Sequence, residues 1–517
     1  MPENALCVSA FLWYHRNVQG KELEWMQKLL TVKFWRFMII ILLAISLLPV
    51  FWIGLYNHSS ADDYSYGCMA RYAWLNTHNI LETLKAAAEK VRQIYFEWQG
   101  SYGAVFLFAL QPAVFGEQFY PLGSFLILGF FLFAVFYFFR KAIRDVFHAN
   151  VHIADVVAGV AALLCIQMMP APVEGFFWWN GSIYYVFFYS LMLVQAVNLM
   201  AAVWYGHCGL GQLAGFLLLA AAIAGGNYIT ALLMMELTVF FFVWALATKK
   251  RIMKKLALLL AVTLVCFLVN CLAPGNAVRQ GAFESWNPIR AVLYSYHEAY
   301  NHMVEWTSPL VVAGMVFLLP FLWQVPIGKL SGGFGTFVLF LGMEFSFFAS
   351  SFTPTLYTYG DVGAGRIQNI RYFLWVFICI AAEFTLVCLI KTMFGCQGEG
   401  SNFRVLRNVY NRYGVPFFAS VVFCAAFFAG NSILADDVRD LASISAAKSL
   451  LSGEAAQYHR EAKERISLLQ GEGMSVELTP FSCKPELLFW EDIKEDPDDW
   501  VNRAVARFYQ KEEVRLR

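Results

Sequence analysis

Long apolar runs separated by short polar stretches occupy most of the chain, from about residue 34 to about residue 431. Runs of about 18 or more apolar residues are typical of helices that cross a bilayer. The polar helix faces that a large soluble core requires are missing from this region. We therefore expect an all-α polytopic membrane protein with about eleven transmembrane helices, near residues 34–56, 119–139, 153–170, 183–204, 211–225, 228–248, 256–273, 309–325, 334–351, 371–391 and 414–431.

One apolar segment, Tyr102 to Phe115, is short for a span and contains Gln111-Pro112 near its end. Two interpretations are open. As a full span it would reverse the sidedness of every later loop. As a re-entrant or interfacial segment it leaves the basic clusters on one side of the membrane, and we prefer this second interpretation.

The segment Asn79 to Trp98 has apolar residues at spacings of three and four, which predicts an amphipathic helix. Asn79 can cap its start, and Glu82 follows three residues later. Such a helix is expected to lie in the membrane interface.

Clusters of lysine and arginine predict the orientation, because cytoplasmic loops carry an excess of these residues. Arg140-Lys141, Lys249-Lys250-Arg251 and the region around Lys391 fall on the same side as the basic N-terminal segment 1–33. That side is predicted to be cytoplasmic. The multi-span domain 34–431 then places its first loop, 57–118, outside. The tail 432–517 is expected outside too.

The tail is a shift in composition, acidic and soluble in character. It predicts a helix from Ser443 to Leu469, a strand at 475–478 and a final helix capped by Asp498-Asp499. We expect a small extracytoplasmic C-terminal domain of α/β or α type.

Composition supports the membrane class: of 517 residues, 59% are hydrophobic and only 15% charged, against about 25% in soluble domains. The net charge of +1 and the lack of any basic arm or zinc-finger spacing give no sign of a nucleic-acid partner. The expected partner is the lipid bilayer.

The acidic pair Asp62-Asp63 follows directly on the first span. Charge so close to hydrocarbon is costly, and an acidic pair there is a candidate site. The other candidates lie in outer loops and supply rings, amides, an acid and cations: Tyr66, Trp98, Glu174, Trp179, Asn180, Asn227, Asn276, Arg279, Arg366 and Arg371.

These residue types suit sugar transfer outside the membrane. A carboxylate can act as a general base toward a hydroxyl, an arginine can hold a phosphate by a bidentate fork, and aromatic rings can stack on sugars. Structural interpretations compete: Asp62-Asp63 could cap a helix, the aromatic run 176–179 could be an interfacial belt, and Arg366 and Arg371 could pair with Asp361.

The loops together resemble the GT-C superfamily of membrane glycosyltransferases, which use polyprenyl-phosphate sugars and carry acids in the first outer loop. The motifs are Asp62-Asp63-Tyr64-Ser65-Tyr66, Trp98-x-Gly100-x-Tyr102, Glu174 with Trp179-x-Gly181-Ser182, Gly226-Asn227 and Ala273-Pro274-Gly275-Asn276-x-x-Arg279. They look like a bacterial family related to the lipid-linked glucosyltransferases of surface polysaccharides. Asp492-Ile493, Trp500-Val501-Asn502 and Phe508-Tyr509 are similar to its outer domain.

The resemblance implies a GT-C-like fold in the bacterial plasma membrane with an extracytoplasmic site. Asp62 or Asp63 would be the catalytic base, and Arg279, Arg366 or Arg371 would hold the donor phosphate. The acceptor would be a glycan or lipid-linked molecule of the cell envelope. A divalent cation, Mg²⁺ or Mn²⁺, is an optional cofactor, since no triad of metal ligands accompanies the acids.

Two other functions stay open. A transporter or flippase would need charges across the membrane, for which Glu236, Glu344 and Glu383 are the candidates. A non-catalytic subunit of polysaccharide assembly would have long outer loops rich in arginine and histidine, which residues 352–370 only partly supply.

Overall fold

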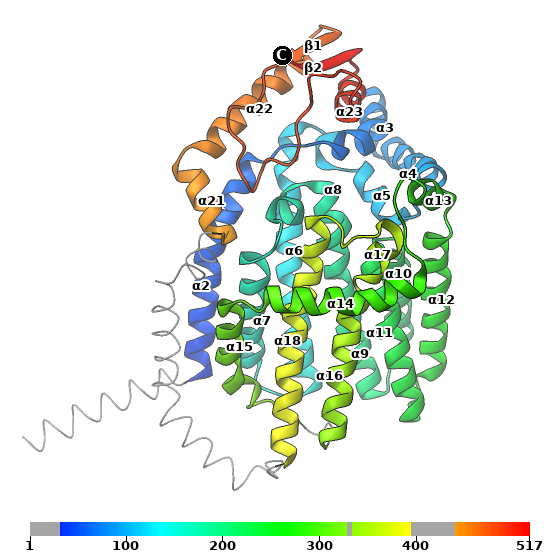
Figure 1. The fold of residues 1–517 in the computed structure, drawn as a ribbon, viewed down its shortest axis with the longest axis vertical. Coiled ribbons are helices and arrows are strands. Elements are labelled where there is room, and N and C mark those ends of the chain that lie inside the picture. The colour runs from blue at the N-terminus through cyan, green and yellow to red at the C-terminus, as the bar shows by residue number, and fades with distance from the viewer. Residues whose placement is uncertain (1–30, 328–332, 394–439) are drawn as a thin grey trace, which may run out of the picture.

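The computed structural model describes residues 31–327, 333–393 and 440–517 (Figure 1). Within these residues, seven helical segments are long and apolar enough to cross a membrane: Val32–Tyr56, Glu117–Val146, Trp179–Tyr205, Tyr228–Ala247, Met253–Cys271, Phe334–Tyr359 and Gly365–Met393. The protein is therefore a multi-pass, α-helical membrane protein. Helices α14 (Pro288–Trp306) and α15 (Pro309–Leu322) would add an eighth crossing if counted as one span, but they meet at 83°.

Three of the predicted spans correspond to helices that are short for a full crossing. The expected spans at 153–170 and 211–225 correspond to α7 (Val151–Gln167) and α10 (Leu210–Ala224), of 17 and 15 residues. The span expected at 309–325 is the 14-residue α15. Helices this short fall below the roughly 20 residues that cross a typical bilayer. The span expected at 414–431 lies outside the described residues.

The spans themselves contain the helices α2 (Val32–Ile53), α6 (Pro121–Phe139), α9 (Phe188–Tyr205), α11 (Tyr228–Ala247), α12 (Met253–Cys271), α16 (Phe334–Ser350), α17 (Thr353–Tyr359) and α18 (Gly365–Met393). Shorter helices connect or cover them: α3 (Asp62–Thr77), α4 (Ile80–Glu97), α5 (Tyr102–Ala109), α8 (Trp179–Ser182) and α13 (Pro274–Gln280). Short 3-10 and π turns join these: η1 (Gly54–Tyr56), η2 (Pro112–Val114), η3 (Glu117–Phe119), η4 (Arg140–Val146), η5 (Val173–Phe177) and η6 (Ile183–Phe187).

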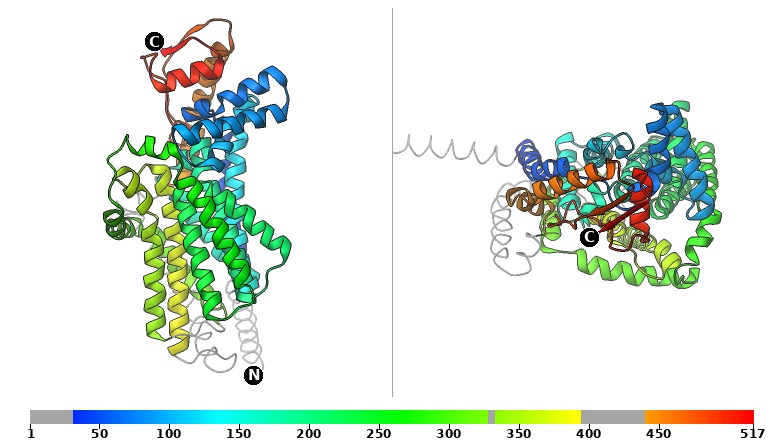
Figure 2. Two further views of the ribbon diagram at one scale, coloured as in Figure 1. Left: turned by 90° about the vertical axis from the view of Figure 1, so that its right-hand side faces the viewer. Right: turned by 90° about the horizontal axis from the view of Figure 1, so that it is seen from above.

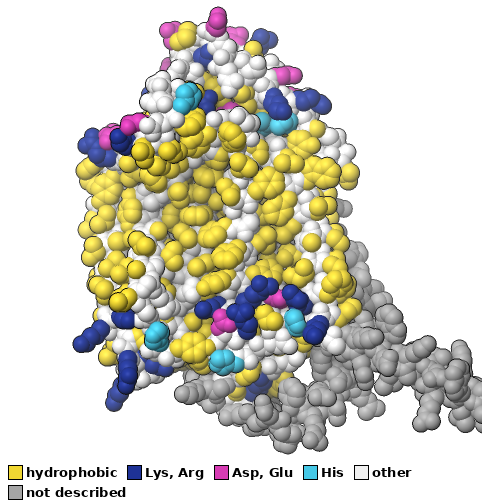
Figure 3. Space-filling view, turned by 180° about the vertical axis from the view of Figure 1, so that it is seen from behind, with side chains coloured by type: hydrophobic (Ala, Val, Ile, Leu, Met, Phe, Trp, Pro, Cys, Tyr) yellow, Lys and Arg dark blue, Asp and Glu magenta, His cyan; other side chains and the backbone are white. Residues whose placement is uncertain are grey.

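A broad apolar band covers the middle of the face shown in Figure 3, and charged side chains gather above and below it. Residues of the band such as Ile45, Leu126 and Leu218 are between 62% and 73% exposed. At one end, Arg36 of α2 and Arg140 of η4 both contact the buried Asp155 of α7, at 2.6 and 2.5 Å. Exposed apolar surface is favourable in lipid and costly in water, so this band is the part that the bilayer covers.

The first loop returns to the end of the molecule from which it started. Helix α5 has eight residues, which rise only about 12 Å. The Ser59 hydroxyl donates to Glu117 at 2.8 Å, so the residues before α3 lie beside those before α6. A full span over Tyr102 to Phe115 is therefore wrong, and the re-entrant or interfacial interpretation fits.

The predicted amphipathic helix is α4. Its start is capped as expected, since the Asn79 side chain accepts from the backbone N–H of Leu81 at 2.9 Å. Behind it, Gly100 packs so tightly that an added Cβ would lie 1.9 Å from the Asn270 carbonyl oxygen. Glycine is required there because two backbones meet.

The C-terminal residues pack on the first loop, at the end of the molecule opposite the Arg36–Asp155 cluster (Figures 1 and 2). They form α21 (Ala442–Leu451), α22 (Glu454–Gln470), β1 (Ser475–Leu478), α23 (Trp500–Tyr509) and β2 (Glu513–Leu516). The predicted strand and the helix capped by Asp499 are confirmed. Strand β2, which pairs parallel with β1, was not predicted.

The single helix expected from Ser443 to Leu469 is wrong, because the chain breaks between α21 and α22. Gly453 lies at the break with a φ of +81°, in the left-handed region that favours glycine. Helix α21 packs along α2, and α22 continues away from it toward the strands.

Candidate active site

The predicted outer loops converge at one end of the molecule. Gly103 donates its N–H to the Gly225 carbonyl at 2.8 Å. The Asn276 side-chain oxygen accepts from the N–H of Gly100 at 2.9 Å and from the Tyr228 hydroxyl at 2.6 Å. These contacts join three loops that are far apart in sequence, so the candidate residues of these loops share one region.

Asp63 is fully buried in the first turn of α3, and its carboxylate is saturated with hydrogen bonds. It accepts from the N–H of Ser60 at 3.1 Å, from the N–H of Asn180 at 3.2 Å and from the Tyr120 hydroxyl at 2.5 Å. Burial raises the pKa of Asp63, and these donors act in the opposite direction. Asp63 therefore ties three loops together.

Asp62, its neighbour, is half-buried and has different surroundings. Within the described chain its carboxylate receives no hydrogen bond. It lies instead within electrostatic range of the guanidinium groups of Arg366 and Arg279. Burial raises the pKa of Asp62, and the two arginines act in the opposite direction. Of the two acids, Asp62 is the one left available to a ligand.

Arg366, at the start of α18, is held from two sides. Its Nη1 atom contacts the Glu174 carboxylate at 2.9 Å. Its guanidinium carbon lies 5.3 Å from the Trp178 ring centroid and 5.7 Å from that of Trp490. The two indole rings stack on each other, 4.7 Å apart and 17° from parallel. A guanidinium fixed in this way is pre-organised to bind an anion.

Arg279, in α13, is surrounded by aromatic side chains. It donates to the Gln99 side-chain oxygen, and its guanidinium carbon lies 5.6 Å from the Trp98 ring centroid and 5.5 Å from that of Tyr359. Its Nε atom is buried and makes no hydrogen bond to the described residues. A buried donor without a partner is costly, which marks this guanidinium as a candidate ligand contact.

Arg371 has a different environment, although the sequence groups it with the other two arginines. It is fully buried, and its guanidinium donates to Ser351 at 3.1 Å, to Thr355 at 2.7 Å and to the Val362 carbonyl at 2.5 Å. It also lies 4.2 Å from the Phe352 ring centroid. These contacts fix the loop before α18, which favours a structural role for Arg371.

Asn227 and Asn276, the two predicted asparagines outside α8, bind neighbouring backbone groups. Asn227 caps α11, accepting from the Thr230 N–H at 2.9 Å, and donates to the Tyr184 carbonyl at 2.6 Å. Asn276 also donates to the Asn270 carbonyl at 2.7 Å. Their hydrogen bonds are satisfied within the protein, and they hold the site rather than face a ligand.

Asn180 differs from these two. Its backbone N–H binds Asp63, while both polar atoms of its side chain are buried and find no hydrogen-bond partner among the described residues. The adjacent Trp179 donates its N–H to Tyr120 and its indole N–H to the Leu107 carbonyl, both at 3.0 Å. Asn180 is thus the amide able to contact a ligand, and Trp179 is a support.

Tyr66 completes the set of predicted residues. It is buried on α3 and is electrostatically coupled to Asp62 and Arg279. Its ring packs edge-on against Phe108 of α5, with centroids 5.1 Å apart. Tyr66 therefore lies near Asp62 and packs on helix α5.

Sequence reasoning missed the contribution of the C-terminal segment. Trp490 stacks on Trp178, and Glu491 is electrostatically coupled to Asp62 and Arg366. The Ser60 hydroxyl donates to the Glu491 carbonyl at 2.9 Å. No local motif marks Trp490, because its partner lies in a loop far earlier in the chain.

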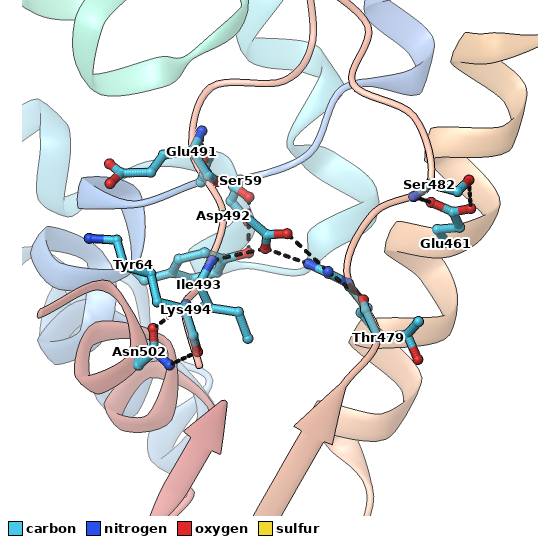
Figure 4. Close-up of polar contacts among 12 residues, drawn as sticks. Ser59, Tyr64, Glu461, Thr479, Ser482, Glu491, Asp492, Ile493, Lys494 and Asn502 are labelled. Atoms are coloured by element: carbon cyan, nitrogen blue, oxygen red, sulfur yellow. Dashed lines mark hydrogen bonds and ion pairs between the residues drawn. The ribbon is translucent and has the colours of Figure 1, made fainter. Parts of the chain in front are cut away.

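The segment that carries Trp490 is anchored by a bidentate ion pair beside Glu491 (Figure 4). Arg465 of α22 binds the two carboxylate oxygens of Asp492 at 2.6 and 3.0 Å, and its Nε donates to the Thr479 carbonyl at 3.0 Å. Asn502 of α23 binds both backbone polar groups of Lys494, two residues after Asp492. The segment is thus fixed over the first loop.

The donor set does not fit a divalent cation. Residues 31–327, 333–393 and 440–517 contain no group of three or more His, Cys, Asp or Glu side chains that could hold a metal ion. Asp62 is accompanied by two guanidinium groups, which supply positive charge themselves. The described residues therefore do not form a site for Mg²⁺ or Mn²⁺.

Comparison with protein-family models, with curated proteins and with solved structures finds no match to this chain.

Proposed function

We propose that this protein is a membrane glycosyltransferase of the GT-C type, with about eleven transmembrane helices and the site on the outer face of the bacterial plasma membrane. It would move a sugar from a polyprenyl phosphate to a glycan or lipid-linked acceptor in cell-envelope polysaccharide synthesis or modification. The observation that carries the proposal is the Asp62 carboxylate, which receives no hydrogen bond from the described residues and lies within electrostatic range of two arginines flanked by aromatic rings.

The proposed step uses these groups directly. Asp62 accepts the proton of an acceptor hydroxyl, and the hydroxyl oxygen attacks the anomeric carbon of the donor sugar. The bond from that carbon to the phosphate oxygen breaks, and the polyprenyl phosphate leaves with the bonding electrons. Arg366 and Arg279 stabilise the charge on the leaving phosphate. A single displacement of this kind inverts the anomeric configuration.

The raised pKa of Asp62 supports the role of a base. Burial makes the carboxylate a stronger proton acceptor than it would be in water, and the two arginines favour its ionised form. Asp63 supports the same chemistry indirectly, because its hydrogen bonds to Ser60, Tyr120 and Asn180 fix the start of α3.

The transporter alternative receives less support. Glu236 accepts one hydrogen bond from the Ser350 hydroxyl at 2.8 Å, and Glu344 accepts one from the Thr385 hydroxyl at 3.1 Å. Within the described residues these acids are not bonded to each other or to Glu383. An ordered relay of charges across the bilayer would need such links.

The experiment is sugar transfer in proteoliposomes from a radiolabelled polyprenyl-phosphate sugar, with Arg366→Lys as the test variant. Lysine keeps the charge but loses the planar fork, so we expect transfer to fall about a hundredfold. Arg503→Lys, at an exposed position on α23, is the matched control and should keep wild-type transfer. Unchanged transfer in Arg366→Lys would remove the phosphate role of that residue. The absence of transfer from any such donor would remove the proposed function.

A further inference from the structure

A large cavity lies apart from the candidate active site, between α11, α14 and α16. Its volume is about 900 Å³, and its lining is mainly apolar, with Leu237, Phe240, Val292, Met343 and Phe347 among its residues. Pockets that hold drug-sized ligands have volumes of about 300–1,000 Å³. The cavity is therefore large enough for a long, flexible apolar group.

The cavity lies where the lipid-facing surface is interrupted by α14. This helix runs across α16 and α18 in Figure 1 and is bent by 83° from α15. Tyr296 of α14 packs against Phe345 of α16, with ring centroids 5.9 Å apart. Its outer face exposes Ile289 and Leu293, at 74% and 69%. A helix with this much exposed apolar surface lies in lipid, so chains from the bilayer reach the cavity from the side.

Helix α17 links the cavity to the candidate active site. Thr353, the first residue of α17, lines the cavity, and Tyr359, the last, lies 5.5 Å from the Arg279 guanidinium carbon. A helix of seven residues spans about 10 Å. A molecule with its phosphate at Arg279 could therefore extend an attached chain into the cavity.

The polar lining selects which part of such a molecule enters. The residues that line the cavity include Glu236 and Glu344 but no Lys, Arg or His. A phosphate would find no cation there, whereas it finds Arg279 and Arg366 at the other end. The cavity thus accommodates an uncharged chain and leaves the phosphate in the active site.

We propose that this cavity, named here the α11–α16 groove, binds the isoprenoid chain of the donor lipid. The inference rests on the proposed function for the identity of the donor. The groove then sets the preference of the enzyme for long-chain donors, because only a long chain gains its apolar contacts.

Two glycines of α16 provide a matched pair of variants. Gly342 lines the groove, and an added Cβ there would meet nothing within 4 Å. An added Cβ at Gly335 would also meet nothing within 4 Å. Gly335 lies two helical turns from Gly342 on the same face of α16, outside the groove lining. Gly342→Phe should fill the groove without a backbone clash, and Gly335→Phe should leave it open. Both replacements favour the helix, so both variants should fold.

The binding experiment uses polyprenyl phosphate with a photoreactive group on its chain, in nanodiscs of phosphatidylethanolamine and phosphatidylglycerol. We expect labelling of α11, α14 or α16 that unlabelled undecaprenyl phosphate competes away. Labelling should fall at least tenfold in Gly342→Phe and persist in Gly335→Phe. Equal labelling by a photoreactive phospholipid, without competition by undecaprenyl phosphate, would overturn the proposal. So would undiminished labelling of Gly342→Phe.

A kinetic arm separates this inference from the function on which it rests. With a long-chain donor, Gly342→Phe should raise KM about tenfold, while a two-isoprene donor should be used as well as by the wild type. If the wild type transfers no sugar but the groove is labelled, the proposed function fails and the lipid site stands. If sugar is transferred and the label falls outside the groove, the groove assignment fails.

Discussion

Replacing each member of the Asp62-Asp63 pair by alanine should separate catalysis from folding. Asp63→Ala removes the acceptor of three buried hydrogen bonds, from Ser60, Tyr120 and Asn180. Each orphaned donor costs about 1–3 kcal/mol, so the loss is about 3–9 kcal/mol. Stabilities of folded domains are about 5–15 kcal/mol, so this change threatens the fold itself.

Asp62→Ala removes no hydrogen bond within the described chain and relieves the burial of a charge. Its effect on stability should stay within about 1 kcal/mol. The proposed base is lost, however, so transfer should fall by about a hundredfold or more. The same contrast distinguishes a catalytic acid from a positioning acid without knowledge of the sugar.

The assays are thermal unfolding in detergent, followed by tryptophan fluorescence, and sugar transfer in proteoliposomes at matched protein amounts. Asp62→Ala should unfold at the wild-type temperature and be inactive, and Asp63→Ala should unfold several degrees lower. Equal unfolding temperatures for the two variants would refute the assignment of Asp63 as the positioning residue. Full transfer by Asp62→Ala would refute the assignment of the base.

The remaining predictions concern the C-terminal residues. Trp490→Ala should raise KM for the donor severalfold, because Arg366 loses one of its two ring contacts; Trp490→Phe should restore much of it, and Trp500→Ala, at an exposed position, should have no effect. A KM unchanged in Trp490→Ala would show that the ring contact does not position the arginine. His58 lies 2.9 Å from His459, and burial lowers the pKa of His58 from 6.5 to about 3, with His459 acting in the same direction. Below pH 6.5 the His58 imidazole therefore binds a proton in the unfolded chain but stays neutral in the folded chain. The free energy of unfolding then falls by about 1.4 kcal/mol for each pH unit below 6.5. Limited proteolysis of the C-terminal region should accelerate from pH 7.5 to pH 5.5 in the wild type, and His58→Gln should reduce this dependence. Identical pH profiles for the two proteins would contradict the reasoning.

The sequence by itself determined the membrane class and much of the local structure. Backbone groups in lipid must be satisfied within each segment, so an apolar run of sufficient length is a helix whatever surrounds it. Caps are equally local, and for that reason the starts of α4 at Asn79 and of α23 at Asp499 could be predicted. The break at Gly453 also has a local signal, the Ser452-Gly453 pair, because both residue types favour turns.

Only the tertiary structure determines which of the candidate side chains are available to a ligand. Asp62 and Asp63 are adjacent in sequence, but successive residues of a helix point about 100° apart, so one faces two arginines and the other a buried network. The three outer arginines look alike in sequence, and packing saturates only Arg371. The Trp178–Trp490 stack depends on the C-terminal segment folding over the first loop, and no spacing within either segment encodes that contact.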